Sequence, residues 1–209
     1  MTHTMPHLQS YAHHIEDGEI YLIPCFLTAS DAERAFSHFY SHLAWQEEAI
    51  KIYAKTVTVP RLVCWYGNPG AVYRYSGVTH EPLEWDSRLS QLKLQLETLC
   101  HHPFNSVLAN LYRNGQDTMG WHADKEKELG SNPLIASLSL GSKRQFELQH
   151  KKTGHQLRFS LGGGDLLIMA GTLQNHWRHR VPKCRDAGPR INLSFRSILS
   201  KSVTTGDLT

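Results

Sequence analysis

The second half of the chain is made of short runs in which apolar and polar residues alternate. Glycine, asparagine, lysine and proline separate these runs from one another. Alternation with a period of two places one set of side chains on each face of a β-strand. Many short strands joined by turns indicate a sandwich, a barrel or a jelly roll. After Phe104 the runs are SVLANLY, LIASLSLG, RQFELQH, HQLRFSL, GDLLIMAG and RINLSFRSI.

Two helices are expected before these strands. The first opens on Ser30-Asp31-Ala32-Glu33, which has the pattern of a capping box, and carries Phe36, Phe39, Tyr40 and Leu43 on one face. The second begins near Asp86 or Ser87 and carries Leu89, Leu92, Leu96 and Leu99.

Between these helices, Lys51–Trp65 favours β-structure interrupted by Pro60, and the aromatic strand AVYRYSG follows a turn. The helices are expected to pack on one side of an antiparallel double sheet. The predicted fold class is therefore α+β, mainly β.

Length and composition indicate one domain. A chain of 209 residues can bury a sizeable core but is short for two domains. Residues 1–18 and 199–209 are polar and are expected to be flexible, which leaves a domain over 19–198 with a core over 104–198. Cys25, Cys64, Cys100 and Cys184 are scattered, so no disulfide framework is predicted.

No run of about 18 apolar residues and no apolar N-terminal segment are present, which predicts no membrane span and no secretory signal. We therefore expect an intracellular protein, cytoplasmic if bacterial and nuclear if eukaryotic. The net charge of +3 is compatible with a polyanionic partner without arguing strongly for one.

A candidate metal site begins with the pair His122 and Asp124. On an extended backbone these residues project from the same face, so an imidazole and a carboxylate can take neighbouring positions on one metal. A distant histidine would complete a 2-His-1-carboxylate triad of the kind found in non-haem iron(II) oxygenases. His176 and His179 are both candidates, and spacing alone does not choose between them.

A candidate anion site lies on the run from Arg190 to Arg196. Its polar face carries Arg190, Asn192, Ser194 and Arg196, and its apolar face carries Ile191, Leu193 and Phe195. Two arginines on an inward face are costly unless an anion satisfies them, and they can grip the two ends of a small dicarboxylate. The alternative is a solvent-exposed strand face. Asn110 and Tyr112 share a face of another strand and can add neutral hydrogen bonds.

These segments together resemble the AlkB-type nucleic-acid demethylases, in the branch that acts on alkylated DNA. The resemblance covers roughly Lys51 to Ile198 and rests on the order of four motifs: Asn110-Leu111-Tyr112, His122-Ala123-Asp124, the stretch from Asn175 to Pro182, and the stretch from Pro189 to Arg196. It implies a double-stranded β-helix, or jelly roll, with a nucleotide-recognition hairpin region over about 51–80.

The resemblance also implies the roles of individual residues. Iron(II) would be held by His122, Asp124 and His179, because in this family the histidine followed by x-Val-Pro is the ligand. The cosubstrate 2-oxoglutarate would be held by Asn110, Tyr112, Arg190, Asn192 and Arg196. Tyr73, Tyr75 and Glu126 would contact the target base, Tyr53 would act as a wedge in the duplex, and Arg61, with Arg74, Lys143, Arg144, Lys151 and Lys152, could contact phosphates.

The implied function is oxidative demethylation of N-alkylated bases, of the 1-methyladenine and 3-methylcytosine type, in DNA, with RNA as a second candidate substrate. The reaction would use Fe(II), O2 and 2-oxoglutarate and release formaldehyde, succinate and CO2. Hydroxylation of a protein or small molecule by the same iron centre is the alternative enzyme activity. A β-sandwich that binds nucleic acid without turnover is a third hypothesis, which retention of the triad and both arginines disfavours. A monomer is expected.

Overall fold

The computed structural model describes residues 5–52, 55–75 and 78–199. Within these ranges the helical elements are η1 (Pro6–Tyr11), α1 (Ala29–His42), α2 (Ser87–Cys100), η2 (Lys127–Leu129) and α3 (Leu173–His176). The strands are β1 (Ala12–His13), β2 (Glu19–Ile23), β3 (Gln46–Ile52), β4 (Lys55–Gly67), β5 (Tyr73–Tyr75), β6 (Val78–His80), β7 (Ser106–Tyr112), β8 (Met119–His122), β9 (Ile135–Gly141), β10 (Arg144–His150), β11 (Gln156–Leu161), β12 (Leu166–Ala170), β13 (Trp177–Val181) and β14 (Arg190–Arg196).

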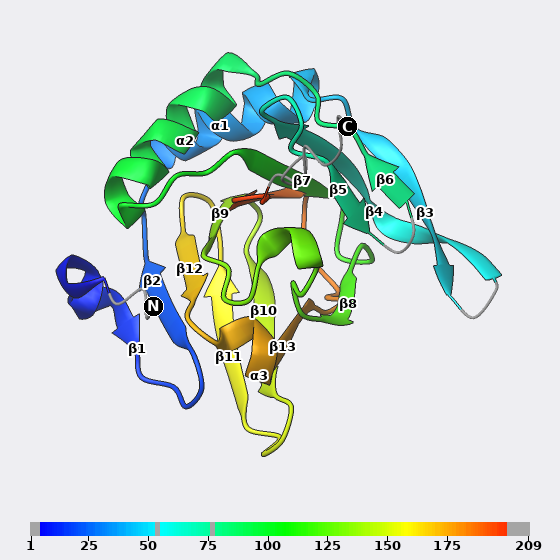
Figure 1. The fold of residues 1–209 in the computed structure, drawn as a ribbon. Helices are drawn as coiled ribbons and strands as arrows, with labels where there is room; N and C mark the ends of the chain where they lie inside the picture. Colours follow the sequence, from blue (N-terminus) through cyan, green and yellow to red (C-terminus); the bar gives the residue numbers. More distant parts are fainter. Residues whose placement is uncertain (1–4, 53–54, 76–77, 200–209) are drawn as a thin grey trace, which may run out of the picture.

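Two antiparallel sheets make up the body of the molecule. The larger has the order β1-β2-β12-β9-β14-β7-β4-β3, and the smaller has the order β11-β10-β13-β8. Helices α1 and α2 lie next to each other along the outer side of the larger sheet (Figure 1). This is the expected mainly-β jelly roll with helices on one side, and β5 and β6 pair separately in the hairpin region.

Strand β14 organises both layers of the core. It lies between β9 and β7 in the larger sheet, with Leu193 opposite both Leu138 and Ala109. Its apolar residues Ile191, Leu193 and Phe195 are fully buried and belong to the cluster beneath the helices. The opposite face points into the space between the two sheets, where a second cluster with Phe146, Leu148 and Trp177 fills one end. The predicted alternation of this strand is confirmed.

The observed helices refine the expected ones. Helix α2 begins as predicted, with the Asp86 carboxylate accepting from the backbone N–H of Leu89 at 3.1 Å. Helix α1 begins at Ala29, two residues earlier than a helix capped by Ser30 would, because Thr28 is the N-cap and its hydroxyl accepts from the Asp31 N–H. Tyr40, expected on the packing face, is 45% exposed.

Two further expectations differ from the structure. Pro60 does not interrupt the strand, since β4 runs through it. The register of β3 against β4 shifts beside this position, so the missing proline N–H breaks no ladder hydrogen bond that the strand needs. Near the N-terminus, η1 and β1 are ordered elements, because Met5 and Leu8 are buried in the cluster beneath the helices. No helix in the described residues is long and apolar enough to span a membrane.

The packing of α2 predicts a difference between two leucines in the same helix. Leu96 is 0% exposed and Leu94 is 60% exposed. Leu96→Ala should lower the free energy of unfolding by about 2–5 kcal/mol, because it leaves a cavity in the core. Leu94→Ala should change it by less than about 0.5 kcal/mol. Urea unfolding monitored by circular dichroism measures both, and equal losses would contradict the assigned packing.

Candidate active site

The structure brings His122, Asp124 and His179 together between the two sheets. His122 ends β8, Asp124 follows two residues later, and His179 lies in β13 directly opposite His122 in the ladder. Their nitrogen and carboxylate oxygen atoms lie within 4.8 Å of one another. His176 lies elsewhere, with an exposed side chain on α3. Geometry therefore selects His179, the choice that spacing left open.

The two imidazoles are oriented so that a metal can complete the cluster. His122 Nδ1 lies 2.9 Å from the Gly120 carbonyl oxygen, which can only accept, so Nδ1 carries the proton. The unprotonated Nε2 then faces Asp124 Oδ1 at 3.7 Å. A cation bound by both of these acceptors would remove the repulsion between them. His179 Nδ1 is buried and has no hydrogen-bond partner in the described chain.

Burial keeps both histidines neutral, as metal ligation requires. Burial, with a smaller contribution from the neighbouring His122, lowers the pKa of His179 to about 3. The pKa of His122 is also lowered, mainly by burial and against the opposing influence of Asp124. Two neutral imidazoles and one carboxylate are the donor set of non-haem iron(II) sites, so the residues fit that metal.

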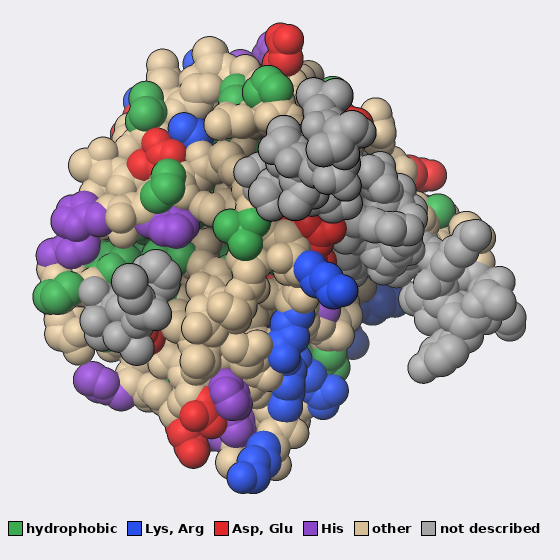
Figure 2. Space-filling model, in the orientation of Figure 1, with side chains coloured by type: hydrophobic (Ala, Val, Ile, Leu, Met, Phe, Trp, Pro, Cys, Tyr) green, Lys and Arg blue, Asp and Glu red, His purple; other side chains and the backbone are tan. Residues whose placement is uncertain are grey.

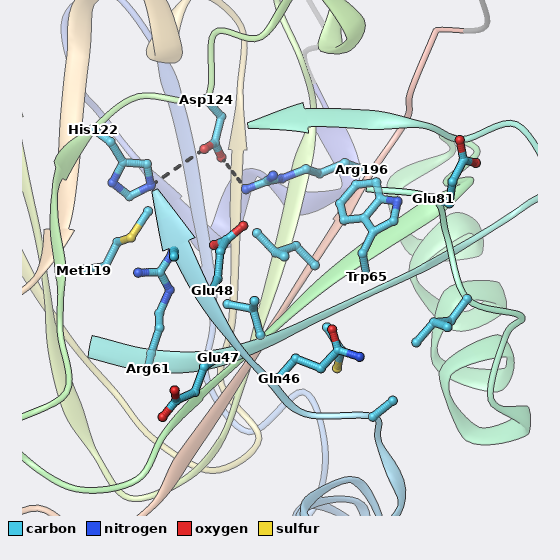
Figure 3. A pocket seen from close by; sticks show the side chains of 16 residues that line it. Gln46, Glu47, Glu48, Arg61, Trp65, Glu81, Met119, His122, Asp124 and Arg196 are labelled. Atoms are coloured by element: carbon cyan, nitrogen blue, oxygen red, sulfur yellow. Dashed lines mark hydrogen bonds and ion pairs between the residues drawn. The ribbon is translucent and has the colours of Figure 1, made fainter. Parts of the chain in front are cut away.

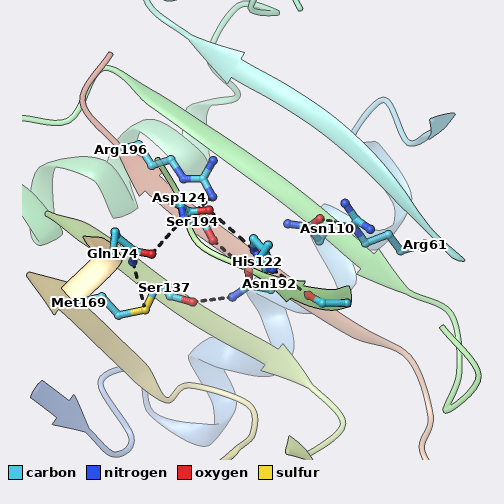
Figure 4. A network of polar contacts seen from close by, with 11 residues as sticks. Arg61, Asn110, His122, Asp124, Ser137, Met169, Gln174, Asn192, Ser194 and Arg196 are labelled. Atoms are coloured by element: carbon cyan, nitrogen blue, oxygen red, sulfur yellow. Dashed lines mark hydrogen bonds and ion pairs between the residues drawn. The ribbon is translucent and has the colours of Figure 1, made fainter. Parts of the chain in front are cut away.

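Asp124 is held as a carboxylate by its surroundings. Burial alone would raise its pKa, but the Arg196 guanidinium and the two histidines hold the pKa below its usual range. Arg196 Nη2 donates to Asp124 Oδ2 at 2.9 Å, with both side chains buried. The backbone N–H of Asp124 donates to Gln174 Oε1 at 3.0 Å, and Gln174 Nε2 contacts Met169 Sδ (Figure 4). Gln174 could not be identified from local sequence pattern, since its contact with Asp124 spans 50 positions.

A polar cavity adjoins the triad on the inner face of the larger sheet. It contains all five residues that the family resemblance assigned to 2-oxoglutarate, together with both triad histidines: Asn110, Tyr112, His122, His179, Arg190, Asn192 and Arg196. Asn192 Nδ2 donates to Ser137 Oγ at 2.8 Å, and Ser194 Oγ donates to Asn192 Oδ1 at 3.0 Å (Figure 4). The alternative of a solvent-exposed strand face is therefore wrong.

Arg190 lines this cavity and has hydrogen-bond donors that a bound anion would satisfy. Its side chain is 1% exposed, and Nη2 donates to Ser139 Oγ at 2.9 Å. Nε and Nη1 have no hydrogen-bond partner in the described chain. Burial lowers the pKa of the guanidinium, while Tyr112, whose ring lies 5.2 Å away, opposes the shift. A buried guanidinium with open donors is stable when a carboxylate fills the fork, which fits a dicarboxylate cosubstrate.

A larger cavity of about 350 Å³ opens on the other side of His122 and Asp124. Arg61, Glu48 and Trp65 project into it (Figure 3). Arg61 is buried, and its Nε donates to Asn110 Oδ1 at 2.7 Å. Glu47 and Glu81 also line the cavity, and sequence analysis missed these two residues and Glu48 because none of the three belongs to a motif.

The remaining candidate residues are placed as follows. Tyr53 lies outside the described residues, and Tyr73 and Tyr75 lie in β5, where only the backbone is described. Glu126 is partly buried immediately before η2 and is not among the residues that line the two cavities. Arg144 was expected to contact phosphate, but it is buried and donates to the Asn114, Asp117 and Pro182 carbonyl oxygens. That expectation is wrong, because its donors are used inside the fold.

Fold and site together define a jelly-roll protein with a buried 2-His-1-carboxylate cluster beside an anion cavity. The sequence model of the 2OG-Fe(II) oxygenase superfamily matches residues 19–196, so the chain belongs to this family. Its cofactors are therefore Fe(II), 2-oxoglutarate and O2.

Relatives within this family are of the AlkB type. The alpha-ketoglutarate-dependent dioxygenase alkB homolog 3 of Bos taurus is 39% identical over 192 residues, which cover 87% of this chain and 66% of that protein. The DNA oxidative demethylase ALKBH2 of Mus musculus is 34% identical over 178 residues, which cover 81% of this chain and 73% of that protein. The chain thus spans 66% of the length of the first of these relatives.

A solved structure supports the fold. OsALKBH1 aligns with a TM-score of 0.63 at 15% identity, covering 89% of this chain and 99% of that one. At this level of identity the match bears on the fold alone, and it agrees with the jelly roll described above.

Gln174 should position Asp124 for metal binding. Gln174→Ala leaves the buried Asp124 N–H without its acceptor, so the loop that carries the carboxylate should loosen. We expect iron(II) affinity to fall about 10–100-fold, as for other residues that orient metal ligands. Anaerobic titration of the chelator-treated protein measures this, with the exposed Gln156→Ala as control. An affinity unchanged within about twofold would contradict this role for Gln174.

Proposed function

We propose that this chain oxidatively removes methyl groups from ring nitrogens of nucleic-acid bases, of the 1-methyladenine and 3-methylcytosine type. The products would be the restored base, formaldehyde, succinate and CO2. The observation that carries the proposal is the pair of cavities that share His122 and Asp124. One suits the dicarboxylate, and the other is large enough to admit a base beside the metal ligands.

His122, Asp124 and His179 would hold iron(II), which, when bound with O2 and 2-oxoglutarate, supplies the oxidation of a methyl C–H bond. Arg190 would receive the carboxylate that lies farther from the metal, since Arg196, and not Arg190, contacts Asp124, and Arg190 Nε and Nη1 have no partner in the described chain. Asn110, Tyr112 and Asn192 would supply neutral hydrogen bonds. Arg196 would keep Asp124 ionised and lie near the other carboxylate.

The outer cavity favours a cationic base. Bases of the 1-methyladenine and 3-methylcytosine type carry a positive charge on the ring, and a carboxylate stabilises that charge. Glu48 is partly buried and projects into the cavity from β3, on the side facing Arg61 and Asp124 (Figure 3). Trp65 supplies an apolar aromatic wall. Tyr73, Tyr75 and Glu126 remain candidate base contacts by resemblance, and Tyr53 remains a candidate wedge.

Basic side chains near the site can hold the phosphate backbone. Lysine and arginine residues gather along one part of the surface shown in Figure 2. Lys125 and Arg178 are exposed, and both lie near enough to Lys151 to lower its pKa, after the larger effect of burial. Arg178 and Arg180 also lie over the Trp121 ring, at 5.1 and 4.5 Å. Cations of this kind position a nucleic acid without reading its sequence.

DNA is the proposed substrate, because ALKBH2 relatives carry the name DNA oxidative demethylase. RNA is a secondary candidate that the same assay addresses, and a monomer is the proposed state. Hydroxylation of a protein or a small molecule by the same centre is the alternative function. The two functions can be told apart by the stimulation of succinate formation. The alternative predicts that methylated oligonucleotides do not increase it.

The proposal is tested with iron(II), ascorbate, 2-oxoglutarate and a 3-methylcytosine oligonucleotide. Mass spectrometry should show restored cytosine together with formaldehyde. Asp124→Ala should reduce turnover by at least about 10³-fold, because the metal loses its only carboxylate ligand. Urea unfolding should confirm that this variant folds. Succinate without base repair by the wild-type protein would favour the alternative function, and repair by Asp124→Ala would contradict the assigned triad.

Glu48 should contribute to the choice of a cationic base. Glu48→Gln keeps the size of the side chain and removes its charge, so KM for 3-methylcytosine should rise about 5–30-fold, which corresponds to about 1–2 kcal/mol. Succinate formation without an oligonucleotide should not change, since the 2-oxoglutarate cavity is intact. Glu33→Gln on α1 is the control, because this glutamate is exposed and lines neither cavity. Equal effects of the two variants would count against a specific role for Glu48.

A further inference from the structure

Arg61 in β4 lies between the two cavities that meet at the active site. Its side chain lines the larger cavity, which Met119 and His122 also line (Figure 3). On its other side, Nε donates to Asn110 Oδ1 at 2.7 Å, and Asn110 lines the polar cavity. Arg61 is 3% exposed, so its donors act inside the fold. A role within the site therefore competes with the phosphate contact that the family resemblance offered for this residue.

The register of two neighbouring strands accounts for the contact between Arg61 and Asn110. Val63 in β4 is directly opposite Asn110 in β7. Arg61 lies two residues before Val63, so it projects from the same face and is the diagonal neighbour of Asn110, within reach of a long side chain. The Thr118 N–H donates to the Pro60 carbonyl oxygen at 2.9 Å, which ties the segment before β8 to β4. Backbone hydrogen bonds thus fix the position from which Arg61 reaches Asn110.

This contact determines which end of the Asn110 amide faces the polar cavity. The Nε–H of Arg61 can only donate, so the atom that it meets on Asn110 is the carbonyl oxygen. The amide nitrogen points away from Arg61 (Figure 4), and Asn110 lines the polar cavity but not the larger one. Without this donor the amide could rotate and present its oxygen instead. A carboxylate accepts from an N–H and is repelled by a carbonyl oxygen, so the observed orientation suits an anionic cosubstrate.

We propose that Arg61 is a positioning residue for 2-oxoglutarate, whose Nε–H holds the Asn110 amide with its nitrogen toward the cosubstrate cavity. This inference rests on the cosubstrate site proposed above, in which Asn110 supplies a hydrogen bond. Arg61 acts through Asn110, since it is not among the residues that line the polar cavity. Because Arg61 lines the larger cavity, a base bound there would lie beside the residue that orients Asn110.

Two substitutions separate the hydrogen bond of Arg61 from its charge. In Arg61→Gln the amide nitrogen occupies the place of Nε along the side chain, so a donor to Asn110 remains while the charge is lost. Arg61→Met keeps an unbranched side chain and removes both the donor and the charge. Binding of 2-oxoglutarate is measured by isothermal titration of the full-length protein, with manganese(II) in place of iron(II) so that no turnover occurs. The Kd should rise at least about 10-fold in Arg61→Met and stay within about threefold of wild type in Arg61→Gln, because only the first variant loses the hydrogen bond that orients Asn110.

A double-mutant cycle ties the effect to Asn110. Asn110→Ala should weaken 2-oxoglutarate binding about as much as Arg61→Met does. The double variant Arg61→Met/Asn110→Ala should lose little more than either single variant, because the two residues act as one unit. Arg88→Met on α2 is the matched control, since this arginine is exposed and lines neither cavity. Urea unfolding checks that each variant folds.

The outcomes distinguish this role of Arg61 from the alternatives. Equal losses of 2-oxoglutarate affinity in Arg61→Gln and Arg61→Met would overturn the proposal, because charge rather than the hydrogen bond would then matter. Unchanged affinity in Arg61→Met, with a raised KM for a 3-methylcytosine oligonucleotide, would overturn it in favour of a phosphate contact. Unchanged affinity in Asn110→Ala would contradict the cosubstrate role of Asn110 and this inference with it. The binding titrations contain no nucleic acid, so a failure of base demethylation leaves their result intact.

Discussion

The rest of the structure depends on two buried arginines on the inner face of β14, whose positive charges must be compensated. Arg190 and Arg196 are 1% and 4% exposed, and a buried guanidinium is costly unless anions and hydrogen bonds compensate it. Arg196 is compensated within the chain by Asp124. Arg190 has Ser139 and the Tyr112 ring on one side and open donors on the other. The fold thus compensates Arg196 within the chain and leaves Arg190 with two unfilled donors, which agrees with the proposed binding of a cosubstrate carboxylate.

This arrangement links the metal cluster to the cosubstrate cavity through one side chain. Asp124 Oδ2 accepts from Arg196, while Oδ1 faces His122. The carboxylate therefore stays ionised despite its burial, and it is oriented before any metal arrives. Gln174 fixes the backbone of the same residue from the opposite direction. Pre-organisation of this kind lowers the cost of ordering the ligands when the ion binds.

The sequence predicted those parts of the structure that follow from local pattern. The alternation along β14 determines which of its side chains face the helices and which form the polar face. The start of α2 follows from Asp86 as its N-cap. Contacts between distant segments could not be predicted in this way. Thr28, not Ser30, caps α1, because both residue types can serve as caps and the local pattern does not distinguish them. Gln174 and Glu48 carry no local signal, because their importance arises when α3 and β3 reach the site.

Sequence pattern could not choose between His176 and His179 as the metal ligand, whereas the physical environment of each residue can. Both belong to a 2-His-1-carboxylate group in the structure, and the two residues are three positions apart. His179 lies in β13, 4% exposed, opposite His122 and next to the anion cavity. His176 lies on α3, facing Asp17 at the surface. An enclosed cluster with room for a cosubstrate can exclude water and direct an oxidation, whereas an exposed cluster cannot. The same three residue types thus occur in two places, and burial together with the neighbouring cavity distinguishes the group that fits a metal-dependent oxidation.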